Sequence, residues 1–111
     1  MRMEETIAEK LSGFTDQLTF ETIPEKVIKK TKDLLLDTLG ICIASSKMDF
    51  GKAALGLIAG WGGVPESSLI GSEAKVPAQN AAFANGVFGH GQDYDDTHTE
   101  SVVHPSACLV P

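Results

Sequence analysis

Apolar residues recur along most of this chain with the period of an α-helix. In the first 20 residues they fall at Ile7, Leu11, Phe14 and Leu18, which lie on one stripe of a helical surface. A stripe of this kind is typical of an amphipathic helix with one apolar face. We therefore predict a first helix from Glu4 to Leu18.

A longer helix is predicted from about Ile23 to Ala44. Residues 22–25 (Thr-Ile-Pro-Glu) mark its start, because Thr22 can cap the helix, Glu25 can close a capping box and proline is tolerated in a first turn. The residues expected to face inward are Val27, Thr31, Leu34, Leu35, Thr38 and Cys42. From Leu39 to Ile43 apolar residues surround the helix, so we expect this end to be fully buried.

A third helix and a short extended segment are predicted in the middle of the chain. Asp49 is a candidate N-cap for a helix from Phe50 to Trp61, which the glycine pair at 62–63 ends. Residues 68–71 (Ser-Leu-Ile-Gly) then suggest a strand or the edge of a hairpin.

A fourth helix is predicted from Ala78 to about His90, opened by Pro77. It is built largely from small residues in two stripes: Ala78, Ala82 and Gly86, with His90 next, and Ala81, Asn85 and Gly89. Small stripes let a neighbouring backbone come close. Either this helix delivers His90 and the following loop to a defined place, or the stripes reflect ordinary tight packing.

The predicted fold is therefore all-α, or mainly helical, with at most one short strand or hairpin. Pro105 suits the first turn of a fifth helix, whose start next to His104 would be a natural seat for an anionic ligand. A length of 111 residues allows at most one domain. Because residues 107–111 open an apolar element just as the chain stops, we expect the N-terminal piece of a longer protein.

Composition and charge narrow the classes of function. The net charge of −6 argues against nucleic-acid binding, which needs a basic face. The N-terminal residues lack the apolar core of a signal peptide, and no apolar run is long enough to span a membrane, so we expect a cytoplasmic protein. Cys42 and Cys108 lie far apart in apolar surroundings, so we expect two buried free thiols.

Residues 89–106 carry the candidate chemistry. They hold every histidine of the chain, His90, His98 and His104, together with the carboxylates of Asp93, Asp95, Asp96 and Glu100. Carboxylates and imidazoles together suit general acid–base catalysis, for example proton abstraction next to a carboxylate. The same groups can bind a divalent metal ion, although their spacing matches no strong metal signature. A solvated loop, in which Asp96 or Thr97 only caps a helix, is the third interpretation.

These residues resemble the MmgE/PrpD family, which includes 2-methylcitrate dehydratase, cis-aconitate decarboxylase and iminodisuccinate epimerase. The resemblance covers about residues 20–111. It rests on residues 36–40 (Leu-Asp-Thr-Leu-Gly), on Asn85-Gly86 followed by His90, on residues 93–97 (Asp-Tyr-Asp-Asp-Thr) and on residues 104–106 (His-Pro-Ser). It implies that the chain is the N-terminal part of a helical core domain, which a smaller α+β lid domain interrupts in sequence.

The resemblance also implies site residues and a type of chemistry. The family's active-site residues match Asp93, Thr97 and His104, and we expect them to be catalytic. His98 and Asp96 are expected to bind substrate. The chemistry would act on small di- or tricarboxylates without a cofactor or metal, usually in a homodimer. The spacing from Thr97 to His104 is one residue longer than in the decarboxylase branch.

The family's further active-site residues, including its lysines, lie downstream of Pro111. Residues 76–111 contain no lysine or arginine, and a polyanionic substrate needs cations. We therefore expect the 111-residue chain to be inactive by itself. Two alternatives remain open: a metal-dependent hydrolase that uses the Asp/His cluster, and a non-catalytic helical module that dimerises through its small-residue helix.

Overall fold

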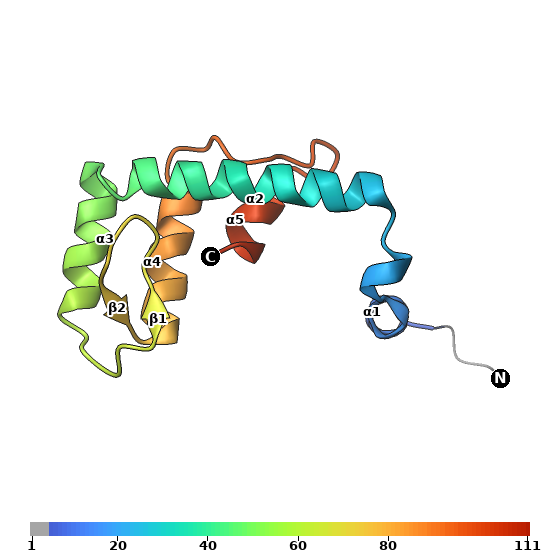
Figure 1. The fold of residues 1–111 in the computed structure, drawn as a ribbon, viewed down its shortest axis with the longest axis horizontal. Helices are drawn as coiled ribbons and strands as arrows, with labels where there is room; N and C mark the ends of the chain where they lie inside the picture. Colours follow the sequence, from blue (N-terminus) through green and yellow to red (C-terminus); the bar gives the residue numbers. More distant parts are fainter. Residues whose placement is uncertain (1–4) are drawn as a thin grey trace. The chain divides into compact units, whose positions relative to one another are not determined.

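The computed structural model describes residues 5–111, and in them the chain is mainly helical, as predicted. Its elements are α1 (Ile7–Gln17), the 3-10 helix η1 (Phe20–Thr22), α2 (Glu25–Ser45), α3 (Asp49–Ala59), β1 (Ser67–Ser68), β2 (Lys75–Val76), α4 (Ala78–His90) and α5 (Pro105–Leu109), shown in Figure 1. None of the described helices has the length and hydropathy needed to cross a membrane.

The chain divides into two compact units, with the boundary after Thr31 inside α2. In the first unit, Thr6 caps α1 and forms a capping box with Glu9, because the Thr6 amide donates to Glu9 Oε2 (2.8 Å) and the Glu9 amide donates to Thr6 Oγ1 (3.3 Å). The predicted first helix is confirmed, but it begins at Ile7; Glu5 precedes it, and Glu4 lies outside the described residues.

The predicted capping box at the start of α2 is wrong. The Thr22 hydroxyl instead closes the turn of η1, donating to the Thr19 carbonyl (2.8 Å) and accepting from the Thr19 amide (3.1 Å). Because both hydrogen bonds of the Thr22 hydroxyl are made to Thr19, this hydroxyl does not cap the next helix. Helix α2 begins at Glu25, directly after Pro24.

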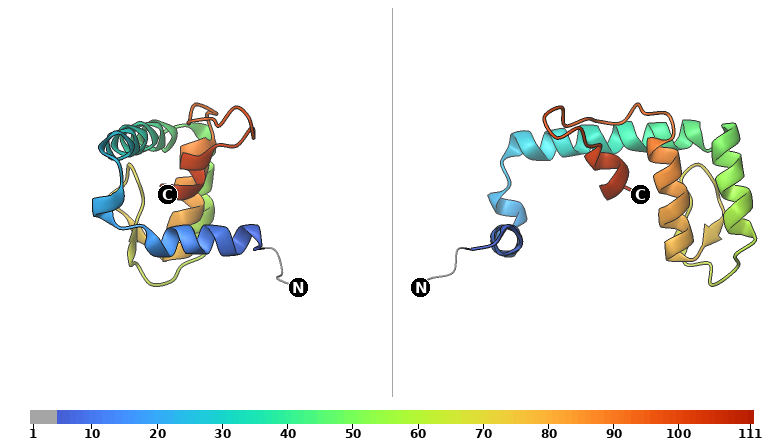
Figure 2. Two further views of the ribbon diagram at one scale, coloured as in Figure 1. Left: turned by 90° about the vertical axis from the view of Figure 1, so that its right-hand side faces the viewer. Right: turned by 180° about the vertical axis from the view of Figure 1, so that it is seen from behind.

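Helix α4 is the centre of the second unit. It packs against α3, α5 and both strands, and Figures 1 and 2 show α3 and α4 running side by side. The predicted bounds, Ala78 to His90, are confirmed. The buried apolar residues of this unit are Cys42, Ala54, Ile58, Leu69, Ala81, Ala84 and Phe88.

Helix α2 meets α4 along one narrow stripe. Thr38 and Cys42 are buried there, and the Cys42 thiol lies 3.7 Å from the Asn85 carbonyl. Ser45, one turn further along α2, is buried where its hydroxyl accepts from Gln92 Nε2 (2.9 Å). The prediction that residues 39–43 are buried all round is wrong, because Leu39 is 39% exposed and Ile43 47%. Among the predicted inward positions, Leu35 is exposed as well, and so are Val27 and Thr31 in the first unit. An apolar pattern shows which faces of a helix can be buried. Which of these faces is actually buried depends on the elements that pack against the helix.

The small stripes of α4 have different environments. Ala81, Asn85 and Gly89 are buried, whereas Ala78 and Ala82 on the other stripe are exposed. The buried stripe is therefore the one that this chain uses for close packing, and the exposed stripe leads to His90.

The hairpin formed by β1 and β2 is fastened to α4 by a buried amide. Asn85 Oδ1 accepts from the Ile70 amide (3.0 Å), and Asn85 Nδ2 donates to the Ser68 carbonyl (3.2 Å). The two strands pair antiparallel, with Ser67 opposite Val76. A short hairpin is present in this part of the chain, as the sequence predicts, but its first strand is Ser67–Ser68. Of the predicted residues 68–71 only Ser68 lies in it, and Ile70 and Gly71 form the turn.

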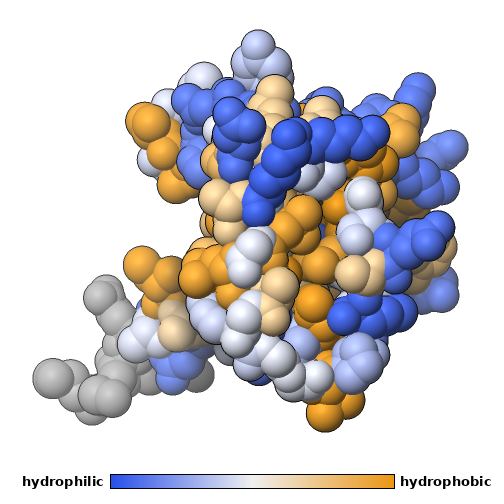
Figure 3. All heavy atoms as spheres, turned by 90° about the vertical axis from the view of Figure 1, so that its left-hand side faces the viewer, coloured by the Kyte–Doolittle hydropathy of each residue, from blue (hydrophilic) through white to orange (hydrophobic). Residues whose placement is uncertain are grey.

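Two further predictions need correction. Asp49 is the first residue of α3 and not its N-cap, because Met48 holds the extended cap conformation; the helix ends at Ala59 with Gly60 as its C-cap. Cys42 is buried as predicted, but Cys108 is exposed. Exposed apolar side chains are frequent, as the orange surface among blue polar side chains shows in Figure 3, so the apolar surroundings of Cys108 in sequence do not imply burial.

Candidate functional site

The site begins where α4 ends. Gly91 is the C-cap residue, and its missing side chain is required, because a Cβ there would collide with the Phe50 ring and lie 2.7 Å from the Val87 carbonyl oxygen. The loop then turns at Asp93, whose φ of 55° lies in the left-handed region that few non-glycine residues adopt. Aspartate tolerates this region better than most residues, and backbone strain of this kind is frequent at functional sites.

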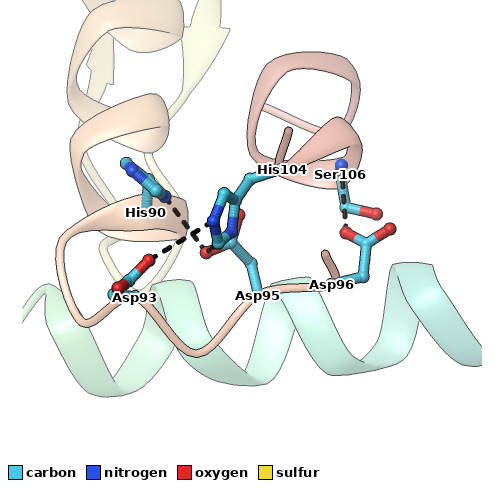
Figure 4. A network of polar contacts seen from close by, with 6 residues as sticks. All are labelled: His90, Asp93, Asp95, Asp96, His104 and Ser106. Carbon is cyan, nitrogen blue, oxygen red and sulfur yellow. Dashed lines mark hydrogen bonds and ion pairs between the residues drawn. The ribbon is translucent and has the colours of Figure 1, made fainter. Parts of the chain in front are cut away.

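His104 stands between two carboxylates. Its Nε2 atom lies 3.5 Å from Asp93 Oδ1, and its Nδ1 atom lies 3.3 Å from Asp95 Oδ1 (Figure 4). The Asp93 side chain is 77% exposed, whereas that of Asp95 is fully buried. The imidazole therefore joins an accessible carboxylate to an inaccessible one, and its Nε2 edge faces the accessible side.

His90 completes this cluster from the last turn of α4. Its Nδ1 atom forms a 3.1 Å hydrogen bond with Asp95 Oδ1, and its ring meets the His104 ring edge-on, with centroids 4.8 Å apart. The histidine at the end of the exposed stripe is thus brought to the site, as one of the two interpretations of α4 expects. We call His90, Asp93, Asp95 and His104 the His–Asp cluster.

Asp95 is the residue that sequence reasoning leaves out of the predicted site. Three aspartates follow His90 within six positions, and nothing in their spacing distinguishes the buried one. The distinction comes from the loop conformation, which turns Asp93 outward and Asp95 inward. No sequence signal in this chain identifies Asp95 in advance.

The other predicted site residues lie around the cluster. Asp96 Oδ1 accepts from the Ser106 amide at the start of α5 (3.1 Å), so this carboxylate fills the predicted anion seat (Figure 4). His98 is exposed, and its Nδ1 atom contacts the Ser101 hydroxyl at 2.7 Å. Thr97 is exposed on the same loop. The structure therefore brings Asp93 and His104 together and gives Asp96 a structural contact.

Two pockets border the loop. One of about 480 Å³ has both rings of the cluster in its wall; its lining residues are Gly86, His90, Val102, Val103, His104, Pro105, Ala107 and Cys108. The other, of about 730 Å³, joins Leu36, Asp37 and Gly40 of α2 to Gln92 and Tyr94 of the loop. The segments at residues 36–40 and 92–94, distant in sequence, thus line one pocket.

The His–Asp cluster also has the donor set of a metal site. One ligand atom from each of its four residues can be chosen so that all lie within 4.8 Å of one another. Two imidazoles with two carboxylates suit Mn²⁺, Fe²⁺ or Zn²⁺ better than Mg²⁺ or Ca²⁺, which prefer oxygen ligands. The arrangement can therefore either move protons or hold a cation.

Comparison with known proteins identifies the same family that the sequence motifs of this chain resemble. The family model for the MmgE/PrpD N-terminal domain matches residues 9–111. Among curated proteins, the chain is similar to the cis-aconitate decarboxylase-like protein oryM of Aspergillus oryzae (27% identity over 97% of this chain and 22% of the relative). It is also similar to the cis-aconitate decarboxylases of Mus musculus (26% identity, 98% and 22%) and Homo sapiens (28%, 98% and 23%).

The chain spans about a fifth of the length of these curated relatives. No solved structure gives a significant match.

Proposed function

Because the chain belongs to the MmgE/PrpD family, we propose that it is the N-terminal portion of a lyase or isomerase that acts on small di- or tricarboxylates by general acid–base catalysis without a cofactor. One observation carries the proposal. The His104 imidazole lies between the carboxylates of Asp93 and Asp95, with Nε2 on the accessible side. Relatives named as cis-aconitate decarboxylases support the substrate class.

In this proposal His104 exchanges the proton. An imidazole can accept a proton at one nitrogen while the other is held, which is the arrangement that a general base needs. Asp93 orients the substrate or accepts a proton, because its carboxylate is exposed beside His104 Nε2. Thr97 binds a substrate carboxylate through its hydroxyl. His98 is a further substrate-binding residue, whereas Asp96 contributes by holding the start of α5 near His104.

The proposed site needs positive charge that this chain does not supply near the cluster. Residues 76–111 contain no lysine or arginine, and a di- or tricarboxylate has to be neutralised when it leaves water. We infer that the remainder of the full-length protein supplies these cations, that the functional form is a homodimer, and that the 111-residue chain alone has no activity.

The test is turnover by the full-length protein of 2-methylcitrate, cis-aconitate and iminodisuccinate, each supplied separately. Asp93→Asn and His104→Ala should each lower the turnover of the accepted substrate by about 10²-fold or more, the usual contribution of general acid–base catalysis. Glu73→Gln, in the exposed turn between β1 and β2, is the control and should keep its rate. Absence of turnover with all three compounds, or near-normal rates in both site variants, would refute the proposal.

The metal-dependent alternative is favoured by the four donors of the His–Asp cluster. It predicts that the purified full-length protein binds one equivalent of Mn²⁺ or Zn²⁺ in calorimetry and that His90→Ala abolishes this binding. It also predicts that EDTA removes activity and that the metal alone restores it. Activity that EDTA leaves unchanged excludes this alternative.

A further inference from the structure

The buried carboxylate of Asp95 has two histidine neighbours. Its side chain is inaccessible to solvent, and both near contacts are to Oδ1: His90 Nδ1 at 3.1 Å and His104 Nδ1 at 3.3 Å. A buried carboxylate is costly unless charged or hydrogen-bonding groups compensate it. Since the chain has no lysine or arginine after Lys75, the two imidazoles are the compensating groups that its own loop provides.

Two atoms in this contact lack hydrogen bonds within the described part of the chain. Asp95 Oδ2 and His104 Nδ1 are both buried without a partner, although His104 Nδ1 is close to Oδ1. A buried polar atom without a partner is destabilising, and a catalytic role is one of the explanations for such atoms in natural proteins. One of these two atoms, His104 Nδ1, is the atom through which the ring approaches Asp95 Oδ1.

We propose that Asp95 is a positioning residue for His104, which holds the imidazole by its Nδ1 edge so that Nε2 faces Asp93 and the accessible side of the site. The inference rests on the function proposed above, because the orientation matters only if His104 exchanges protons with a substrate. An ionised carboxylate only accepts hydrogen bonds, so the His104 proton belongs on Nδ1 and the lone pair of the neutral ring on Nε2. His90 Nδ1 forms a 3.1 Å hydrogen bond with the same oxygen and keeps the carboxylate turned inward.

The variant Asp95→Asn distinguishes a role of Asp95 in positioning His104 from a role in folding. The two side chains have nearly the same shape, but the amide can donate a hydrogen bond to His104 Nδ1 and so favours the opposite tautomer. In the full-length protein, Asp95→Asn should lower kcat by about 10²-fold or more, with KM changed by less than about threefold. Asp95→Glu, which retains the carboxylate, should recover part of kcat, and Glu73→Gln, in the exposed turn between β1 and β2, should match the wild type.

A second measurement is independent of turnover. In full-length protein labelled with ¹⁵N-histidine, at alkaline pH where imidazoles are neutral, the His104 signal should show the Nδ1-protonated form. Asp95→Asn should shift it to the Nε2-protonated form, and His104→Gln identifies the signal by its loss. If no carboxylate is turned over, the proposed function fails while this measurement still decides the role of Asp95.

An Nε2-protonated His104 in the wild type overturns the proposal, even if Asp95→Asn does not fold. An unchanged tautomer in a folded Asp95→Asn variant also overturns it. The proposal is also overturned if Asp95→Asn keeps a kcat within about threefold of the wild type while His104→Ala is inactive.

Discussion

Replacing Gly91 with alanine tests whether the end of α4 is packed as tightly as the structure shows. Gly91 has φ −61° and ψ −17°, values that alanine adopts without strain. Any effect of the methyl group must therefore come from its surroundings. An ideal Cβ would collide with Phe50 Cε2, and it would lie 2.7 Å from both Phe50 Cζ and the Val87 carbonyl oxygen. The Val87 carbonyl is backbone and cannot rotate away.

Gly86 provides the matched comparison in the same helix. A Cβ at Gly86 meets nothing within 4 Å. Replacing a glycine with alanine where φ and ψ suit alanine is favourable by about 0.4–1 kcal/mol, because the unfolded chain loses conformational freedom, and this term is common to both positions. The difference between the two variants is then the overpacking cost alone, about 1–3 kcal/mol. Gly91→Ala should be the less stable variant by this amount.

The assay is urea unfolding of the purified protein, followed by far-ultraviolet circular dichroism. Gly86→Ala should unfold at a higher urea concentration than the wild type, and Gly91→Ala at a lower concentration than Gly86→Ala. Phe50→Leu combined with Gly91→Ala should recover part of the loss, because the smaller side chain vacates space next to the new methyl group. Equal midpoints for Gly91→Ala and Gly86→Ala would show that the helix end is loosely packed.

Three further predictions concern single side chains. Asn85→Ala should lower the free energy of unfolding by about 1–3 kcal/mol, because two backbone groups of the hairpin lose their partner; urea unfolding of the variant checks this. Burial raises the pKa of the Cys42 thiol above its ordinary value of 9.0. The folded protein then keeps this proton to higher pH than the unfolded chain, so the free energy of unfolding should fall as pH rises above 9, and less so in Cys42→Ala. Hydrogen bonds from the Thr6 amide and hydroxyl lower the pKa of Glu9 below its ordinary value of 4.5, so the capping box should weaken as pH falls; a ¹³C NMR titration of Glu9 with a midpoint at or above 4.5 would contradict this.

The sequence predicts the start of a helix well where a local residue preference, such as that of proline, determines it. Pro77 and Pro105 lie directly before or at the start of α4 and α5, because proline fits only the first turn of a helix. Burial is predicted less well. Leu39 and Ile43 are apolar yet exposed, since the buried stripe of α2 in this unit is formed by Thr38, Cys42 and Ser45. Which stripe is covered depends on partners distant in sequence.

The same limit applies to the candidate site. The concentration of histidines and carboxylates identifies the loop, and the family resemblance selects Asp93 and His104, whose side chains lie together in the structure. It does not identify Asp95, whose inward direction depends on a left-handed turn at Asp93. Local composition predicts where chemistry can occur, whereas the backbone path determines which carboxylate faces His104.

Gly89 connects the packing of the helices to the geometry of the His–Asp cluster. A Cβ at Gly89 would lie 3.6 Å from the Cys42 thiol and 3.8 Å from both Ala107 Cα and a Thr38 methyl group, so α2, α4 and α5 meet at this residue. Gly89 directly precedes His90, and Ala107 follows His104 by three positions. The close approach of α4 and α5 at Gly89 therefore also sets the separation of the two histidine rings, which are 4.8 Å apart. The two interpretations of α4 that the sequence leaves open are therefore compatible. The buried stripe of Ala81, Asn85 and Gly89 packs tightly, and this packing brings His90 to Asp95 and His104.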